Sequence, residues 1–254
     1  MSCQLSIIIP VYGSEHILPE LVSKINQSLN KLYENYEIIF VCDQSPDQSW
    51  NVIKSLSQQA PNIKGILLQN NVGQHNALMA GLKHAKGEII VTMDDDLQHS
   101  PKDISSLTLE IEKGHDVAYA CFKEHKHPLW KIMGSRLNDQ IAVYLLNKPK
   151  GLYLSPFRAM KSSIRDALLR YSSPHVYLDA LILSVTHDIV SIEVDHHERH
   201  AGESRYGLKK SLALWFNMLR NNSIMAKILL TKVSQPQYIV SEIIGLNSMD
   251  NEAL

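Results

Sequence analysis

The sequence predicts an α/β fold with a mostly parallel, doubly wound sheet and flanking helices. Short apolar runs alternate with stretches whose apolar residues recur at helical spacing, and two of the runs in the first half end at acidic residues. No internal repeat or low-complexity linker divides the 254 residues. Since parallel strands need crossover connections, which are usually helical, repeated strand–helix alternation favours a parallel sheet. In such a sheet, ligands bind at the carboxyl ends of the strands.

The first half of the chain supplies the alternations. Strands are predicted over residues 5–11, 37–41, 63–68 and 89–93, and helices over 18–29, 47–56 and 75–85. In the first helix, Leu18, Leu21, Val22, Ile25 and Leu29 recur at helical spacing, and we expect Ser14 or Glu15 to cap it. Asp43, Gly73 and Asp94 would then share one edge of the sheet.

The second half is less regular. Helices are predicted over residues 101–113, 129–146 and 177–185, and strands over 116–122, 157–160 and 189–194. Residues 1–206 are expected to form one domain. Residues 207–254 are expected to add a basic, amphipathic helical segment and a tail to the same unit, because Leu212, Trp215, Phe216 and Leu219 fall on one helical face. The pattern predicts no role for residues 235–254.

Three consecutive aspartates, Asp94 to Asp96, follow the apolar run at 89–93. Side chains alternate along an extended backbone, so Asp94 and Asp96 are expected on one side and Asp95 on the other. Two converging carboxylates repel one another unless a cation lies between them, and oxygen ligands suit Mg²⁺ or Mn²⁺. The stretch predicts a metal–diphosphate site. The alternative is a solvated acidic turn that caps the helix beginning at Pro101.

Composition narrows the function classes. The formal net charge is −1 with both signs evenly spread, so nucleic acid is not an expected partner. Three widely spaced cysteines without a CxxC motif fit a reducing compartment. No signal peptide is recognised, and no apolar run reaches the roughly 18 residues of a membrane span. These features predict a cytoplasmic protein, soluble or peripheral on the inner face of the cytoplasmic membrane.

Six short blocks occur in a specific order. They are Ile-Pro-Val-Tyr at 9–12, Asp-Gln-Ser at 43–45, Asn-Val-Gly-Gln at 71–74, Met-Asp-Asp-Asp-Leu-Gln-His at 93–99, Phe-Arg at 157–158, and Gly-Glu-Ser-Arg-Tyr at 202–206 after Arg199. This set resembles family 2 glycosyltransferases of the GT-A fold, especially the dolichyl- and polyprenyl-phosphate sugar transferases. The resemblance spans roughly residues 4 to 232. It implies an inverting transferase that uses a nucleotide-sugar donor and Mg²⁺ or Mn²⁺.

The resemblance also implies roles for individual residues. The donor would be held by Pro10, Tyr12, Asp43, Gly73, Asp94, Asp95 and Ser204, the metal by Asp94, Asp96 and Gln98, and catalysis would depend on Asp179, Arg199 and Arg205. Asp43 would contact the donor base, and Asp96 the metal that bridges the diphosphate. The guanidinium groups of Arg199 and Arg205 would stabilise charge on the departing nucleotide.

The chain departs from the family pattern at several places. Cys42 replaces an acid before Asp43, Asn70 replaces a common arginine, and Pro156 stands where many members have aspartate. The trailing transmembrane helices of the polyprenyl-phosphate enzymes have no counterpart here. These differences leave two acceptors open.

The two acceptors differ in chemistry. A lipid phosphate is already ionised and needs no general base, whereas a sugar hydroxyl must lose its proton to a positioned carboxylate. Asp179 is the candidate base; its alternative is a helix-capping or paired structural carboxylate. Residues that resemble the acceptor-holding groups of the lipid-phosphate enzymes are Lys123, Lys131, Ser135 and Arg136. Their alternative is a set of solvated polar residues.

The amphipathic pattern after Tyr206 suits a membrane surface. The alternative is packing on the chain's own sheet or on a second subunit of a homo-oligomer. Two other functions are alternatives. One is a sugar nucleotidyltransferase, which would need a glycine-rich, basic loop after the first strand, and the other is a binding module that has lost catalysis. Residues 10–15 lack the loop, and the intact acidic block from Asp94 to Gln98 argues against the module.

Overall fold

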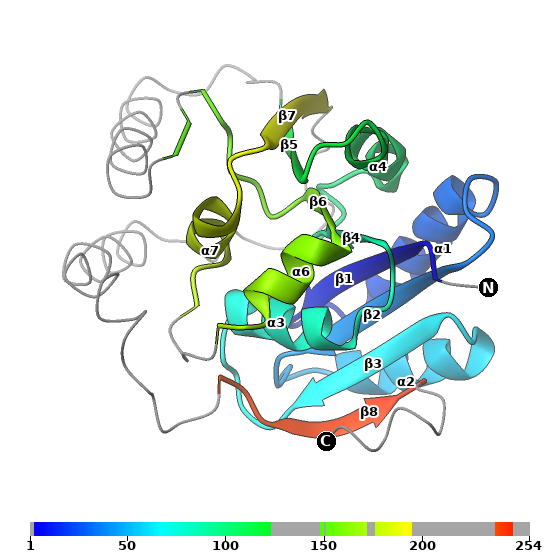
Figure 1. Ribbon diagram of the computed structural model, residues 1–254. Coiled ribbons are helices and arrows are strands. Elements are labelled where there is room, and N and C mark those ends of the chain that lie inside the picture. The colour runs from blue at the N-terminus through cyan, green and yellow to red at the C-terminus, as the bar shows by residue number, and fades with distance from the viewer. Residues whose placement is uncertain (1–2, 123–147, 150, 172–175, 195–236, 246–254) are drawn as a thin grey trace, which may run out of the picture.

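The computed structural model describes residues 3–122, 148–149, 151–171, 176–194 and 237–245. Within them the chain forms one mixed sheet with the order β7-β5-β6-β4-β1-β2-β3-β8, covered by helices on both faces (Figure 1). The pairs β1–β2, β1–β4, β2–β3 and β5–β7 are parallel, and β3–β8, β4–β6 and β5–β6 are antiparallel. The expected α/β architecture is confirmed.

The elements follow the predicted order closely. The strands are β1 (Leu5–Val11), β2 (Tyr36–Cys42), β3 (Ile63–Leu68), β4 (Ile89–Thr92), β5 (Val117–Phe122), β6 (Arg158–Lys161), β7 (Ile189–Val194) and β8 (Val240–Ile244). The helices are α1 (Leu18–Leu29), α2 (Ser49–Gln59), α3 (Gln74–His84), α4 (Ile104–Glu112) after the short 3₁₀ turn η1 (Pro101–Asp103), α6 (Ser162–Leu168) and α7 (Leu178–Val185). The predicted helix at 129–146 lies outside the described residues.

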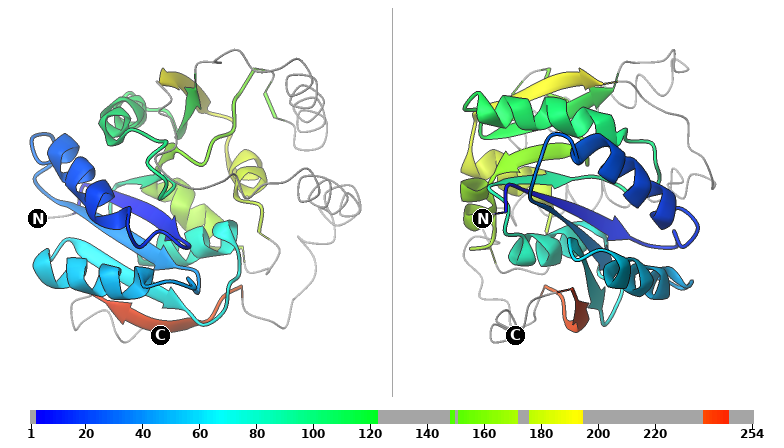
Figure 2. Two further views of the ribbon diagram at one scale, coloured as in Figure 1. Left: turned by 180° about the vertical axis from the view of Figure 1, so that it is seen from behind. Right: turned by 90° about the vertical axis from the view of Figure 1, so that its right-hand side faces the viewer.

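Two apolar layers hold the helices on the sheet. In β1, Ile7 and Ile9 face the layer that contains the buried residues of α1 and α4, whereas Ile8 faces the layer of α3, α6 and α7. This alternation follows from the two-residue period of a strand. Figure 2 shows α1 and α2 in front of the sheet when the molecule is seen from behind. The sheet is therefore buried on both faces, as a doubly wound fold requires.

Strand β8 was not predicted. It pairs antiparallel with β3 at one edge of the sheet, although its residues lie within a tail to which the pattern gave no role (Figure 1). The indole Nε1 of Trp50 in α2 donates a 3.0 Å hydrogen bond to the Glu242 carboxylate of β8. The sheet thus includes residues from beyond position 206. The amphipathic helical segment predicted after residue 206 lies outside the described residues.

The cap predicted for the first helix is wrong. Helix α1 begins at Leu18 with Ile17 as its N-cap and with no side-chain cap hydrogen bond. The Ser14 backbone carbonyl accepts hydrogen bonds from the N–H groups of Ile17 and Leu18, while the Ser14 hydroxyl donates to Asp95. That hydroxyl belongs to the site described below.

Candidate functional site

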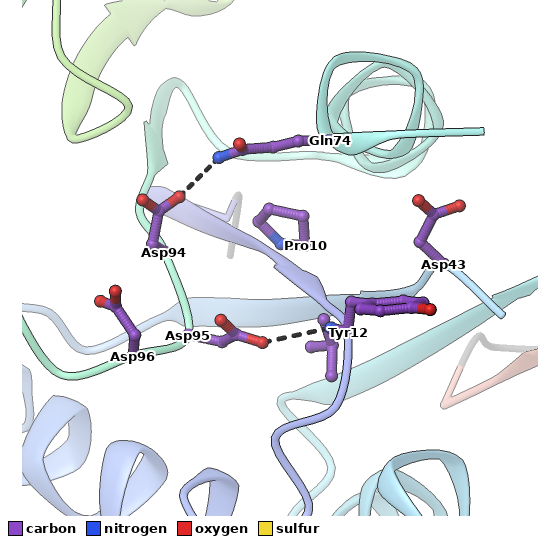
Figure 3. Close-up of a pocket in the computed structure, with 8 residues that line it drawn as sticks. Pro10, Tyr12, Asp43, Gln74, Asp94, Asp95 and Asp96 are labelled. Carbon is purple, nitrogen blue, oxygen red and sulfur yellow. Dashed lines mark hydrogen bonds between the residues drawn. The ribbon is translucent and has the colours of Figure 1, made fainter. Parts of the chain in front are cut away.

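A cavity of about 200 Å³ lies where β1, β2 and β4 end. It is lined by Pro10, Val11, Tyr12, Asp43, Gln74, Asp94, Asp95 and Asp96 (Figure 3). Parallel strands bring their carboxyl ends to one edge, so residues more than 80 positions apart meet here. Ligand pockets usually measure about 300–1,000 Å³. A ligand as large as a nucleotide sugar would therefore extend beyond this cavity.

The three aspartates lie in the irregular segment that follows β4. Strand β4 ends at Thr92, one residue earlier than predicted, and Leu97 adopts a left-handed backbone conformation with φ of 61°. All three aspartates line the cavity, and Figure 3 shows the Asp95 side chain directed toward Tyr12. Asp95 was expected to point away from Asp94 and Asp96, but it lines the same cavity as they do.

The Asp95 carboxylate joins two loops. Its Oδ2 atom accepts a 2.5 Å hydrogen bond from the Ser14 hydroxyl and a 3.2 Å hydrogen bond from the Tyr12 backbone N–H. Burial raises the pKa of Asp95, while these two hydrogen bonds oppose the rise because they favour the charged form. Asp95 thereby fixes the segment that follows β1 against the segment that follows β4.

Asp94 is held from two sides. Its side-chain Oδ1 accepts a 2.6 Å hydrogen bond from the Gln74 amide, and its backbone N–H donates to Nδ1 of His99 at 3.1 Å. The His99 ring stacks on Phe157 with 5.1 Å between ring centroids. Burial raises the Asp94 pKa to about 7, and repulsion from Asp96 and Asp95 adds to the rise.

The carboxylate cluster fits a divalent cation. The donor atoms are oxygens, which Mg²⁺ and Mn²⁺ prefer, and a cation would relieve the repulsion that raises the Asp94 pKa. Among the described residues, no group of three or more histidine, cysteine or acidic side chains is arranged to hold a metal by itself. Mg²⁺ is usually held by one or two carboxylates and completes its shell with water and substrate phosphates, so this cluster would supply part of the coordination shell.

Gln98 was expected in the metal shell. Its backbone N–H donates a 3.1 Å hydrogen bond to the Asp96 carboxylate. The residue is not among those that line the cavity. The structure thus places the main chain of Gln98 beside the cluster.

Asp43 lies at the other end of the cavity and binds the loop between β3 and α3. Its carboxylate accepts hydrogen bonds from the backbone N–H groups of Val72 at 2.8 Å and Gly73 at 2.9 Å. Its backbone carbonyl accepts a third from the Asn71 amide at 3.1 Å. Gly73 has φ of 84°, which favours glycine. Burial raises the Asp43 pKa against the two backbone hydrogen bonds.

Asp179 is a paired, buried carboxylate. It lies in the first turn of α7, accepts a 2.8 Å hydrogen bond from the Tyr119 hydroxyl and forms an ion pair with Arg158. Both residues are buried, and Asp179 is not among the cavity-lining residues. Of the two predicted alternatives for Asp179, this geometry matches the paired structural carboxylate.

The remaining predicted residues lie outside the described part of the chain. They are Arg199, Ser204 and Arg205 of the diphosphate group, and Lys123, Lys131, Ser135 and Arg136 of the acceptor group.

Three residues that contribute to the site were not predicted from the sequence. Gln74 contacts Asp94, Ser14 contacts Asp95, and His99 holds the Asp94 backbone. For Gln74 a signal was present, because it opens the helix that follows the third strand and so begins at the same edge of the sheet. Nothing local marks Ser14, since its partner lies 81 residues away.

Comparisons with known proteins show which family the chain resembles. The family model described as glycosyl transferase family 2 matches residues 6–169. Undecaprenyl-phosphate 4-deoxy-4-formamido-L-arabinose transferases of Enterobacter sp. (strain 638) and Edwardsiella ictaluri (strain 93-146) are each 31% identical, over 85% and 84% of this chain. The transferase of the same name from Aeromonas hydrophila subsp. hydrophila is 32% identical over 84% of the chain. The chain spans 66% of the length of each of these relatives.

Solved structures support the GT-A fold. Glucosyl-3-phosphoglycerate synthase from Mycobacterium tuberculosis superposes with a TM-score of 0.62 at 13% identity, covering 94% of this chain and 87% of that one. Its complex with Mn²⁺, UDP-glucose and phosphoglyceric acid gives a TM-score of 0.61 at 14% identity, covering 91% and 81%. The family model covers well over half of this chain, and the predicted resemblance is thereby confirmed: the chain belongs to glycosyl transferase family 2.

Proposed function

We propose that this chain is an inverting, metal-dependent glycosyltransferase that moves a sugar from a nucleotide-sugar donor to a lipid-linked acceptor, namely a polyprenyl phosphate. The product would serve the synthesis of cell-surface glycolipid or polysaccharide. Family membership supports sugar transfer, and the names of the relatives support the acceptor. The observation that carries the choice of acceptor is the buried ion pair of Asp179 with Arg158.

The donor would bind across the cavity. Asp94 and Asp96 would hold Mg²⁺ or Mn²⁺, with Asp43 at the nucleobase end. A bound divalent ion supplies charge neutralisation to the departing nucleotide diphosphate. Tyr12 is 43% exposed and lines the cavity, so its ring would offer a flat face to the donor. Arg199, Ser204 and Arg205 would add donors to the diphosphate, as the family resemblance implies.

The acceptor chemistry needs no proton transfer. An ionised phosphate oxygen of the lipid attacks the anomeric carbon of the sugar, and the bond from that carbon to the diphosphate oxygen breaks. The electron pair leaves with the nucleotide diphosphate, and the configuration at the carbon inverts. A general base has no task in this step. Asp179 is then free to serve as the buried partner of Arg158.

A lipid acceptor would bring the protein to a membrane. None of the helices in the described part of the chain has the length and hydropathy needed to cross a bilayer. We propose a peripheral attachment at the cytoplasmic face because the amphipathic pattern after Tyr206 suits a membrane surface. Flotation with vesicles rich in anionic lipid tests this attachment. A homo-oligomer is the alternative use of the same apolar face, and sedimentation would reveal it.

A donor panel tests the proposed reaction. The protein is incubated with Mn²⁺ and individual nucleotide sugars, with and without polyprenyl phosphate, and nucleotide release and lipid products are measured. We expect nucleoside diphosphate release that depends on the lipid, together with a glycosylated polyprenyl phosphate. Transfer only to a hydroxyl acceptor would overturn the acceptor assignment. Formation of a nucleotide sugar from a sugar phosphate would instead identify a nucleotidyltransferase.

A further inference from the structure

Gln74 connects the two ends of the cavity. It is the first residue of α3, it lines the cavity, and its Nε2 atom lies 2.6 Å from Oδ1 of Asp94. Figure 3 shows its side chain reaching across to Asp94 from the side of α3. The contact joins the first residue of α3 to a residue 20 positions later that lies just beyond the end of β4. No role for Gln74 follows from the family resemblance described above.

The backbone that carries Gln74 is itself anchored. Asp43 accepts hydrogen bonds from the N–H groups of Val72 and Gly73, the two residues that precede Gln74. Gly73 is the N-cap of α3 and has a left-handed backbone. Asp43 therefore fixes the point from which the Gln74 side chain extends. A carboxylate at the nucleobase end is thus linked to a carboxylate at the metal end through two consecutive residues.

The chemistry of Gln74 suits a supporting role beside a metal ligand. Its amide is a neutral donor, so it orients one oxygen of Asp94 without adding a positive charge that would compete with a cation. The Asp94 backbone is separately held by His99, which leaves the side-chain torsions for Gln74 to fix. Groups that orient metal-binding carboxylates by hydrogen bonds usually change metal affinity 10- to 100-fold when they are removed.

We propose that Gln74 is a positioning residue that holds Asp94 in the orientation in which it receives the divalent cation of the donor complex. Through Gly73 and Asp43, the same residue couples nucleotide binding to metal binding. The inference rests on the proposed function, because it assumes a metal-bound nucleotide in this cavity.

Binding measurements test the inference without catalysis. The variants are Gln74→Met, which keeps side-chain length but removes the donor, Gln74→Ala, and the control Gln59→Ala. Gln59 lies at the end of α2, and its amide donates to Ser55 of the same helix. Mn²⁺ affinity is measured from the electron paramagnetic resonance signal of free Mn²⁺, with and without UDP. UDP affinity is also measured in EDTA, and thermal melting reports folding.

We expect Gln74→Met and Gln74→Ala to weaken Mn²⁺ binding in the presence of UDP by about 10-fold or more. UDP affinity in EDTA should stay within about 2-fold of that of the wild type, and Gln59→Ala should match the wild type in every measurement. A purely structural role would lower the melting temperature and leave the Mn²⁺ affinity of the folded protein unchanged. Unchanged Mn²⁺ affinity in both folded Gln74 variants would overturn the inference.

The same data separate this inference from the proposed function. If the wild-type protein binds neither Mn²⁺ nor UDP, the proposed donor site and the inference both fail. If it binds both but transfers no sugar to polyprenyl phosphate, the proposed function fails, and the role of Gln74 is still decided by the binding of its variants.

Discussion

The guanidinium group of Arg158 donates a hydrogen bond to the carboxylate of Asp179, and the two side chains are 2% and 10% exposed. Arg158 lies in β6 and Asp179 in α7, so the pair fastens a helix to the sheet. Tyr119 donates to the same carboxylate from β5. Burying an ion pair is costly, and such a pair is stable only when its members satisfy one another.

Replacing Asp179 with asparagine should therefore destabilise the protein more than it impairs chemistry. We expect a loss of about 3–5 kcal/mol in unfolding free energy, because Arg158 would be left buried and uncompensated. Urea unfolding of the variant and the wild type measures this difference in free energy. The control is Asp166→Asn, whose partner is Arg165 in a pair that is 17% and 58% exposed. That exposed pair should contribute at most about 1 kcal/mol.

The acceptor assignment predicts the activity of the same variant. Folded Asp179→Asn protein should retain transfer to polyprenyl phosphate when rates are corrected for the folded fraction. Loss of transfer by about 10³-fold or more at full folding would show that Asp179 acts as a base, since general bases contribute about 10²–10⁴-fold.

Asp96→Ala should abolish Mn²⁺-dependent binding of the donor while leaving the fold intact. Asp96 lines the cavity and takes part in the repulsion that raises the Asp94 pKa, so its removal deprives the cation of a ligand. We expect Mn²⁺ affinity in the presence of UDP to fall at least about 10-fold. Asp188→Ala is a suitable control, because that carboxylate is 50% exposed and pairs with His115. Turnover equal to that of the wild type in Asp96→Ala would refute the metal site.

The raised Asp94 pKa predicts a pH dependence of stability. The folded protein holds this proton up to about pH 7, whereas an unfolded aspartate releases it near 3.8. Between these values the folded state binds more protons, so the contribution of Asp94 to stability falls as pH rises. Asp94→Asn should therefore melt at least about 2–4 °C higher than the wild type at pH 8. The difference should vanish near pH 4, and a constant difference across this range would contradict the assignment.

Metal binding should show the opposite pH trend. A cation must displace the Asp94 proton, so Mn²⁺ affinity in the presence of UDP should rise by up to about 10-fold per pH unit below pH 7 and level off above it. Titrations at several pH values measure this slope. A flat profile from pH 5.5 to 8 would indicate that Asp94 is not a ligand.

The position of β8 predicts a packing effect at Gly65. A Cβ atom at this glycine of β3 would lie 2.6 Å from Cγ2 of Ile53 and 2.8 Å from Cγ1 of Ile244. Gly65→Ala should cost about 1–3 kcal/mol in unfolding free energy through overpacking. Combining it with Ile244→Ala should recover part of that loss in a double-mutant cycle, because this change removes the Cγ1 and Cδ1 atoms that the added Cβ would meet. Strict additivity would show that β8 does not pack here in solution.

The sequence by itself determined the elements and the edge at which the site lies. The predicted bounds of β1, β3 and β7 equal the observed ones, because apolar periodicity and its interruption are local signals. The placement of Asp43 and Asp94 in one cavity also followed from the sequence, since a parallel sheet gathers the carboxyl ends of its strands at one edge.

Only the tertiary structure decided which polar groups pair. The hydrogen bond from Ser14 to Asp95, the ion pair of Arg158 with Asp179 and the addition of β8 beside β3 all join distant parts of the chain. The local sequence pattern does not indicate such partners. They are selected when the sheet assembles, because a polar group that is buried without a hydrogen-bond partner destabilises the fold. The sequence thus specified a sheet edge lined with carboxylates. The packed fold decided which groups hold Asp95 in the cavity and Asp179 outside it.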